Sequence, residues 1–395
     1  MFQTDKIKTR RKNITRNPHG GGNTRLLLVM LGYLCLIKGA VAAPQIPAMF
    51  AFGDSLIDDG NNNGLNSLAK SNYYPYGIDF YQGSTGRFCN GKTVVDALCM
   101  LDAPFLPLSL SCDLLELPYI PAYTTAGPNG TSRLGGVNYA SAGGGILDET
   151  GQHLGERYSL NQQVLNFESD LNSIRAVLGT DRSYNQFLAR SIAVMVFGSN
   201  DYINNYLLPS LYNSGYNYTP EQFANLLLNH YTRQILALNS VGLRKFLLAG
   251  VGPLGCIPSQ RASGAARPDR CVDQVNEMVV FFNQGLRSLV EQLNSSHPGS
   301  IFIYGNTYAA VGDMLNNPAN YGFSVLDRGC CGIEQNYEWQ FTCLPLSTPC
   351  PNRNQYVFWD AFHPTESVNL ILAQKAYTGN QTDVYPINVQ QLAQL

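Results

Sequence analysis

The chain has 395 residues, of which 45% are hydrophobic and 14% are charged, and its formal net charge is −2. This length and hydrophobic content allow a core large enough for one large α/β domain. The near-neutral net charge argues against a basic nucleic-acid-binding surface and against a long acidic tail. We therefore expect no nucleic-acid partner.

Residues 1–42 are typical of a secretory signal peptide. A basic region precedes the apolar run LLLVMLGYLCLI at 26–37, and the small-x-small sequence Ala40-Val41-Ala42 follows. The run has the length of a signal-peptide core and is too short for a comfortable membrane span. We predict cleavage after Ala42, one domain over 43–395 without a membrane span, and secretion to the apoplast. The alternative is an uncleaved N-terminal anchor.

Strand-like and helix-like segments alternate along the rest of the chain. Nearly continuous apolar runs, which are typical of buried parallel strands, occur at 48–52, 137–140, 192–198, 245–251 and 300–305. Apolar residues three or four apart predict amphipathic helices at 160–179, 220–242 and 272–294. This alternation predicts a parallel sheet with helices on both faces.

Polar clusters follow the first three predicted strands. They are Gly53-Asp54-Ser55, the run from Ser141 to Gly145, and Gly198-Ser199-Asn200-Asp201. In a doubly wound sheet the site lies beyond the carboxyl ends of the strands, so these clusters should meet. Ser55 is a candidate nucleophile. Its backbone N–H, an N–H of the glycine run and the side chain of Asn200 are candidate donors to an oxyanion.

A serine nucleophile needs a histidine base with a carboxylate partner. His230 lies inside a predicted helix, and His153 and His297 lie in polar segments with no acid at a useful spacing. His363 has Asp360 three residues before it, in YVFWDAFHPTE. This offset lets the carboxylate reach Nδ1 of the ring and leaves Nε2 for the serine. The alternative is a capping aspartate beside a surface histidine.

Other motifs are absent or have a structural interpretation. Asp54 and Asp58 are expected to hold their loop through local hydrogen bonds. No GxSxG elbow or HExxH occurs and no P-loop follows a predicted strand, so we expect no metal and no organic cofactor.

The cysteines indicate an oxidising destination. Ten are present, and an odd number remains once Cys35 leaves with the signal peptide. A cluster late in the chain consists of Cys330, Cys331, Cys343 and Cys350. We expect these cysteines to form disulfides rather than a zinc site, and their pairing is left open. Candidate glycosylation sites are Asn129, Asn217, Asn294 and Asn380.

The ordered motifs give the chain a family resemblance. They are FAFGDSLIDDGNNN, YYPYGIDF, GRFCNGKTVVD, GGVNYASAGGGI, FGSNDYINNY, GVGPLGCIP, CCG and FWDAFHPTE, and they cover about residues 47–378. In this order they are specific, and the chain resembles the plant branch of the GDSL esterase/lipase family, the SGNH hydrolases.

The resemblance implies a fold and a set of site residues. The fold would be α/β, a flavodoxin-like three-layer α/β/α sandwich with a five-stranded parallel sheet. The family's nucleophile, base and third triad member fall on Ser55, His363 and Asp360. Its oxyanion donors fall on the Ser55 N–H, on Gly144 and on Asn200. Cys89 stands where the family often has serine, which would account for the odd thiol.

The resemblance also implies a function. We expect a secreted serine esterase or lipase that hydrolyses carboxylic esters of lipids or other acyl compounds through an acyl-enzyme on Ser55. Acyl transfer to an alcohol, as in cutin or wax assembly, is an alternative on the same site. A non-catalytic wall or defence-related binding protein is a third reading, which the complete Ser55–Asp360–His363 set disfavours.

Overall fold

The computed structural model describes residues 45–99, 114–127, 130–263, 270–332 and 343–395. The chain divides after Ala43, and Pro44–Leu395 forms the second unit. The predicted signal peptide at 1–42 lies outside the described residues, so its cleavage stays a prediction. Among the helices of the described ranges, none has the length and apolar character needed to cross a membrane.

The main sheet has the strand order β2-β1-β3-β4-β5-β8. Its first five members are parallel, and this 2-1-3-4-5 order is that of flavodoxin-like folds. Each forms where an apolar run predicts it: β1 (Met49–Gly53), β2 (Gly136–Asn138), β3 (Ile192–Val196), β4 (Lys245–Ala249) and β5 (Ile301–Gly305). The three-layer α/β prediction is therefore confirmed.

The sheet differs from the expected five strands by one addition. The sixth strand, β8 (Val384–Tyr385), forms the edge of the sheet and pairs antiparallel with β5. Two residues are too short to carry a periodicity signal, so the sequence pattern could not predict this strand. A separate two-stranded parallel sheet pairs β6 (Val325–Gly329) with β7 (Tyr356–Phe358).

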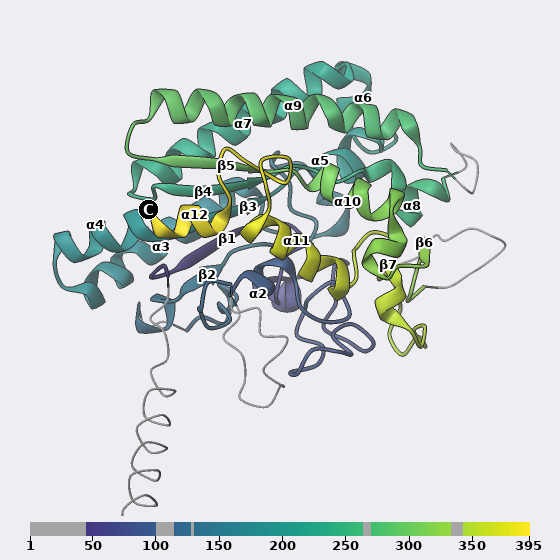
Figure 1. Ribbon diagram of the computed structural model, residues 1–395, viewed down its shortest axis with the longest axis horizontal. Helices are drawn as coiled ribbons and strands as arrows, with labels where there is room; N and C mark the ends of the chain where they lie inside the picture. The colour runs from purple at the N-terminus through teal and green to yellow at the C-terminus, as the bar shows by residue number, and fades with distance from the viewer. Residues whose placement is uncertain (1–44, 100–113, 128–129, 264–269, 333–342) are drawn as a thin grey trace, which may run out of the picture. The chain divides into compact units, whose positions relative to one another are not determined.

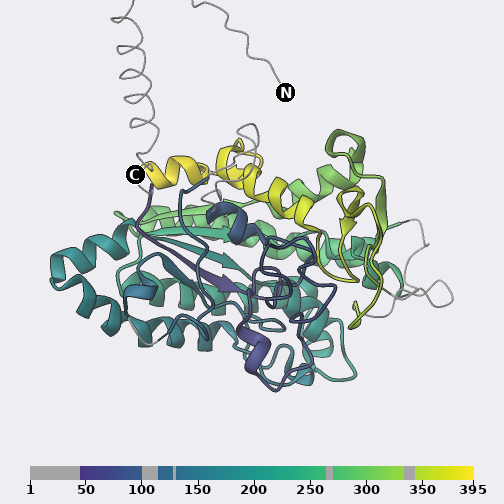
Figure 2. The ribbon, with the colours of Figure 1, turned by 90° about the horizontal axis from the view of Figure 1, so that it is seen from below.

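Helices cover both faces of the main sheet, as Figures 1 and 2 show. One face packs on α3 (Leu160–Leu178), α7 (Pro220–Ser240) and α9 (Asp273–Ser296). The other packs on α2 (Val94–Cys99), α11 (Glu366–Thr378) and α12 (Val389–Gln394). Within the described ranges the other α-helices are α4 (Asp181–Arg190), α5 (Ser199–Asp201), α6 (Ser214–Asn217), α8 (Pro258–Arg261) and α10 (Thr307–Asn316).

The long helices begin and end at the residues that their sequences indicate. The α3 helix starts after Ser159, whose side chain accepts from the N–H of Gln162, and ends at Gly179, which has a φ of 74°. The α7 helix starts with a capping box between Thr219 and Gln222. These caps explain why the predicted bounds of α3 and α7 nearly match the observed ones.

Candidate active site

Ser55 lies in a tight turn directly after β1. All five β1 residues are buried, and the N–H groups of Ile57 and Asp58 donate to the Asp54 carbonyl at 3.2 and 3.0 Å. A Cβ on Gly53 would lie 2.7 Å from the Ile57 side chain and 2.9 Å from the Val196 carbonyl oxygen. Only glycine therefore lets the turn fold back this tightly, and Ser55 stays partly accessible at its tip.

His363 links Ser55 to Asp360. Its Nε2 lies 2.8 Å from Ser55 Oγ, and its Nδ1 lies 2.9 and 2.8 Å from the two carboxylate oxygens of Asp360. An ionised carboxylate only accepts hydrogen bonds, so Nδ1 carries the hydrogen and Nε2 accepts from the serine hydroxyl. The structure thus brings these three predicted residues together, across 308 positions of sequence.

Asp360 shapes the turn that carries His363. Its Oδ1 accepts from the N–H groups of Phe362 and His363 at 2.8 and 2.7 Å, which explains the DxxH spacing. Its Oδ2 accepts from the hydroxyl of buried Tyr76 at 2.7 Å. Burial alone would raise the pKa of Asp360, but the His363 ring and the hydrogen bonds from His363 and Tyr76 hold it below its ordinary value.

The glycine run and Asn200 meet beside Ser55. The side-chain amide of Asn200 donates to the Gly144 carbonyl at 3.0 Å, while the Gly144 N–H donates to the Ser141 carbonyl at 3.0 Å. Among the described residues, the N–H groups of Ser55 and Gly143 have no hydrogen-bond partner. The N–H of Gly145 likewise has no partner in the described part of the chain, so the open backbone donors at this edge are those of Ser55, Gly143 and Gly145.

Asp58 ties the serine loop to the glycine loop. Its oxygens accept from the N–H groups of Gly60 and Asn61 at 2.8 Å each, and from Ala142 at 2.9 Å. Burial raises its pKa to about 6. The local hydrogen bonds expected for Asp58 are present, and the bond to Ala142 extends them to a second loop.

Asp201 ties the glycine loop to α5. It accepts from the N–H groups of Ile146 and Leu147 at 2.9 and 3.1 Å and from the Thr150 hydroxyl at 2.8 Å. Burial raises its pKa to about 6. Asp58 and Asp201 together fasten the three loops to one another.

Asp54 is the third buried acid of the site. Its Oδ1 accepts from the Leu56 N–H at 3.0 Å, and its buried Oδ2 has no partner in the described part of the chain. Burial raises its pKa to about 7, against the hydrogen bond from Leu56 and the attraction of His363. Its carboxyl group lines the cavity beside Ser55.

Three supporting residues were not identified from the sequence. Asn61 and Asn62 donate through their side chains to backbone carbonyls at the end of β2 and in the loop after it, at 2.7 to 2.8 Å. Their signal was the run of three asparagines after Ser55. Tyr76 had only a weaker signal, a tyrosine-rich motif whose partner lies 284 positions away.

The other predicted sites have mixed outcomes. His153, His230 and His297 contact Tyr212, Arg233 and Ser296 rather than Ser55. Asn217 and Asn380 are exposed. Asn294 is half-buried, and its amide bonds the Phe302 backbone at 2.8 and 2.9 Å. Asn129 lies outside the described residues. Glycosylation of all four stays a prediction.

The late cysteine cluster forms disulfides, as predicted. Cys330 pairs with Cys350 and Cys331 with Cys343. A third disulfide joins Cys256 to Cys271. Of the described cysteines, Cys89 and Cys99 are free and buried. Cys89 is therefore a free thiol, as the resemblance suggests, although a second one accompanies it.

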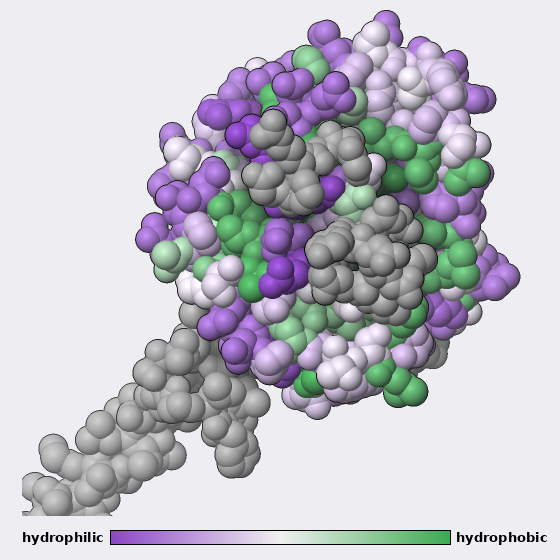
Figure 3. All heavy atoms as spheres, turned by 90° about the vertical axis from the view of Figure 1, so that its right-hand side faces the viewer, coloured by the Kyte–Doolittle hydropathy of each residue, from purple (hydrophilic) through white to green (hydrophobic). Residues whose placement is uncertain are grey.

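The surface near the site is mixed in character. Figure 3 views the side on which α8, α10 and the β6–β7 sheet lie in Figure 1, and patches of hydrophobic residues lie among hydrophilic ones there. The cavity that contains Ser55 and His363 is lined mostly by aliphatic side chains. Such a combination of convergent polar groups and apolar walls is typical of a small-molecule site.

The chain is similar to known proteins over most of its length. The family model described as GDSL-like lipase/acylhydrolase matches residues 49–376. The protein named GDSL esterase/lipase At1g71250 of Arabidopsis thaliana is 52% identical over 98% of this chain and 100% of its own length. Two others from that plant, GDSL esterase/lipase At5g08460 and GDSL esterase/lipase 7, are 54% and 46% identical over 89% of this chain, and the matches cover 88% and 93% of their lengths.

Proposed function

This chain belongs to the GDSL-like lipase/acylhydrolase family, and on that premise we propose that it is a serine carboxylic ester hydrolase working through Ser55. The observation that carries the proposal is the continuous chain of hydrogen bonds from Ser55 through His363 to Asp360, each 2.8 to 2.9 Å long. A hydroxyl, an imidazole and a buried carboxylate in this order form the constellation of acyl-transfer hydrolases.

The proposed reaction has two halves. His363 Nε2 takes the Ser55 proton as Oγ attacks the ester carbonyl, and the imidazolium then gives that proton to the departing alcohol. Water, activated by the same Nε2, attacks the acyl-enzyme and releases the carboxylic acid. Asp360 has a lowered pKa, so it stays ionised and stabilises the imidazolium in both halves.

We propose that backbone and side-chain donors stabilise the tetrahedral oxyanion. The Ser55 N–H and the second N–H of the Asn200 amide are two of them. Gly144 is a weaker candidate for the glycine donor, because its N–H already donates to the Ser141 carbonyl. The N–H of Gly143 makes no such bond, so Gly143 is a better candidate than Gly144. The carbonyl of Gly144 has a separate task, because it holds the Asn200 amide in place.

Secretion is part of the proposal. The three disulfides between described cysteines are typical of proteins that mature in an oxidising compartment. The predicted signal peptide at 1–42 supports the same route.

The test is hydrolysis of a p-nitrophenyl ester series, from acetate to palmitate, by the wild type and by Ser55→Ala. We expect a loss on the order of 10⁶-fold in kcat for every ester that the wild type cleaves. Ser240→Ala, an exposed serine at the end of α7, is the matched control and should retain full activity. Equal activity of wild type and Ser55→Ala would overturn the assignment, and product analysis with an added alcohol would distinguish hydrolysis from acyl transfer.

A further inference from the structure

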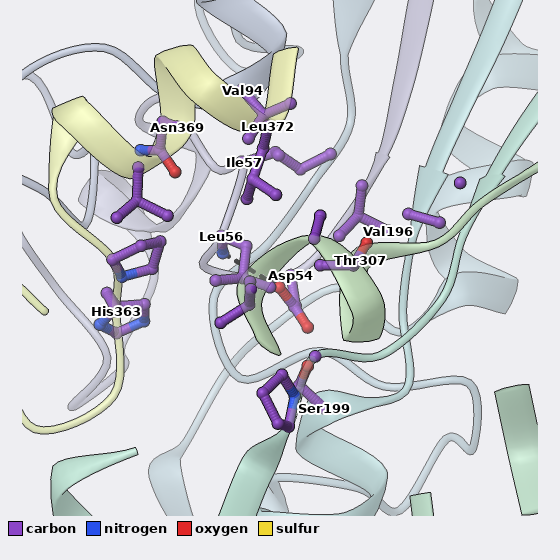
Figure 4. Close-up of a pocket in the computed structure, with 18 of the residues that line it drawn as sticks. Asp54, Leu56, Ile57, Val94, Val196, Ser199, Thr307, His363, Asn369 and Leu372 are labelled. Carbon is purple, nitrogen blue, oxygen red and sulfur yellow. Dashed lines mark hydrogen bonds between the residues drawn. The ribbon is translucent and has the colours of Figure 1, made fainter. Parts of the chain in front are cut away.

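A cavity of about 160 Å³ opens from Ser55 and His363. A single water needs about 10–15 Å³ on the same measure, so the cavity is roughly ten times larger than a hydration site. It continues away from the triad between the main sheet and α11, in the layer that packs α2, α11 and α12. Figure 4 shows Asn369 and Leu372 of α11 on one side and Val196 and Thr307 on another.

The floor of this space is a row of strand ends. Val196, Ala249 and Gly305 are the last residues of β3, β4 and β5, and they are paired in register across the sheet. Each is partly accessible, although the central residues of these strands are buried. The side chains become smaller from valine to alanine to glycine, so the floor becomes deeper with distance from β1.

The roof is one stripe of α11. Val368, Leu372 and Ala376 line the cavity, and their spacing of four residues places them on the same helix face. The far end carries Lys375 and Asp383, whose ammonium and carboxylate lie 3.0 Å apart. We call the space between this floor and this roof the α11 channel.

The α11 channel is suited to the acyl part of an ester rather than to the alcohol part. The acyl group stays bonded to Ser55 between the two halves of the reaction, whereas the alcohol must leave before water enters. A deep apolar space that ends at an ion pair retains an uncharged chain and would trap a leaving group. This argument rests on the function proposed above.

We propose that the α11 channel binds a straight, uncharged acyl chain that runs from Ser55 across the ends of β3 and β4 towards β5. Three strand spacings from β1 to β5 amount to about 14 Å. An extended hydrocarbon chain advances about 1.25 Å per carbon with C–C bonds near 1.52 Å, so about ten or eleven carbons fill this distance. The substrate class is therefore an ester of a medium-length, unbranched fatty acid.

The first test is the acyl-length profile of kcat/KM, with p-nitrophenyl esters kept monomeric. The wild type should gain roughly fourfold per added methylene from butyrate to about decanoate, because each methylene leaves water. The gain should stop beyond about dodecanoate. A profile that is highest at acetate and falls with length would overturn the proposal.

The second test narrows the channel. Ala376→Phe should lower kcat/KM for decanoate and dodecanoate at least tenfold and leave acetate and butyrate within twofold. Gln374→Phe adds the same ring to an exposed position of α11 and should leave the whole profile unchanged. Ala249→Val adds two methyl groups nearer to Ser55 and should shorten the preferred chain further, which keeps the test valid should Ala376→Phe fail to fold.

The outcomes separate this inference from the proposed function. Wild-type activity on short esters with profiles unchanged by Ala376→Phe and Ala249→Val would overturn the channel and leave the esterase intact. Absence of hydrolysis of any ester by the folded wild type would overturn the proposed function and the channel with it. Loss of activity on the longer esters in both Ala376→Phe and Ala249→Val, with activity on the short esters kept, supports the channel.

Discussion

At the scale of single residues, Asp360 combines structural and chemical tasks. One of its oxygens closes the turn through two backbone N–H groups, and both face the imidazole of His363. The hydroxyl of Tyr76 then satisfies the buried side of the same carboxylate. Without this bond Oδ2 would keep only His363 Nδ1 as a partner, and a buried carboxylate would lose a hydrogen bond to a charged group. Tyr76 is therefore a positioning residue for Asp360.

Tyr76→Phe should lower kcat by roughly ten- to a hundredfold and leave KM within twofold, because a hydrogen bond to a charged group contributes about 1.5–3 kcal/mol and Tyr76 does not line the cavity. Steady-state kinetics on one good ester measure both constants. Tyr73→Phe is the matched control, since its hydroxyl donates to the Cys343 carbonyl at 2.9 Å and not to the triad. Equal losses in the two variants, or a loss confined to KM, would show that Tyr76 has no positioning role.

At the scale of elements, the site depends on fastening the loops that follow β1, β2 and β3 and on holding β7 beside β6. The N–H of Cys331, after β6, donates to the Trp359 carbonyl, after β7, at 2.7 Å. The Cys331–Cys343 disulfide closes a loop of 12 residues at this point. Disulfides and buried acids therefore hold segments too irregular for sheet pairing.

Replacement of Cys331 and Cys343 together by serine should lower the free energy of unfolding by about 3 kcal/mol, because an open loop regains conformational entropy in the unfolded chain. Urea denaturation of the secreted protein measures the change. The control is Cys89→Ser, which removes a free buried thiol and breaks no disulfide. A double variant as stable as Cys89→Ser would mean that the disulfide contributes nothing to the stability of the fold.

At the scale of the whole molecule, three buried acids beneath the loops couple stability to pH. Burial raises the pKa of Asp54 to about 7 and those of Asp58 and Asp201 to about 6, against an ordinary value of 3.8. At pH values between the ordinary pKa and the raised pKa, the folded chain keeps these carboxyl groups protonated, whereas the unfolded chain has released the protons. The stability that the three protonated carboxyl groups contribute is therefore complete below about pH 4 and is lost as the pH rises through 6 and 7.

Asp54→Asn should be stabilised relative to wild type at pH 8 and much less so at pH 5. The shift of about three pKa units corresponds to at most about 4 kcal/mol, and the amide carries no charge to desolvate. Denaturant unfolding of both proteins at the two pH values measures the difference. If the two proteins keep the same stability difference at pH 5 and at pH 8, the buried carboxyl of Asp54 does not titrate in this range.

Local patterns were sufficient to predict much of this protein. The apolar runs and the helices between them predicted five strands and their parallel orientation, since buried parallel strands need continuous hydrophobicity and crossover helices. The ordered motifs indicated the family, which the comparisons confirm. The DxxH spacing predicted the contact between Asp360 and His363, because both lie in one turn.

Only the tertiary structure decided what depends on residues far apart in the chain. The Tyr76 bond to Asp360, the third disulfide between Cys256 and Cys271, and the edge strand β8 leave no periodic trace in the sequence. Likewise, the register of β3, β4 and β5 and the packing of α11 above them create the α11 channel. Hydrophobic periodicity specifies which face of an element is buried, whereas the volume left between two packed faces depends on both of them at once.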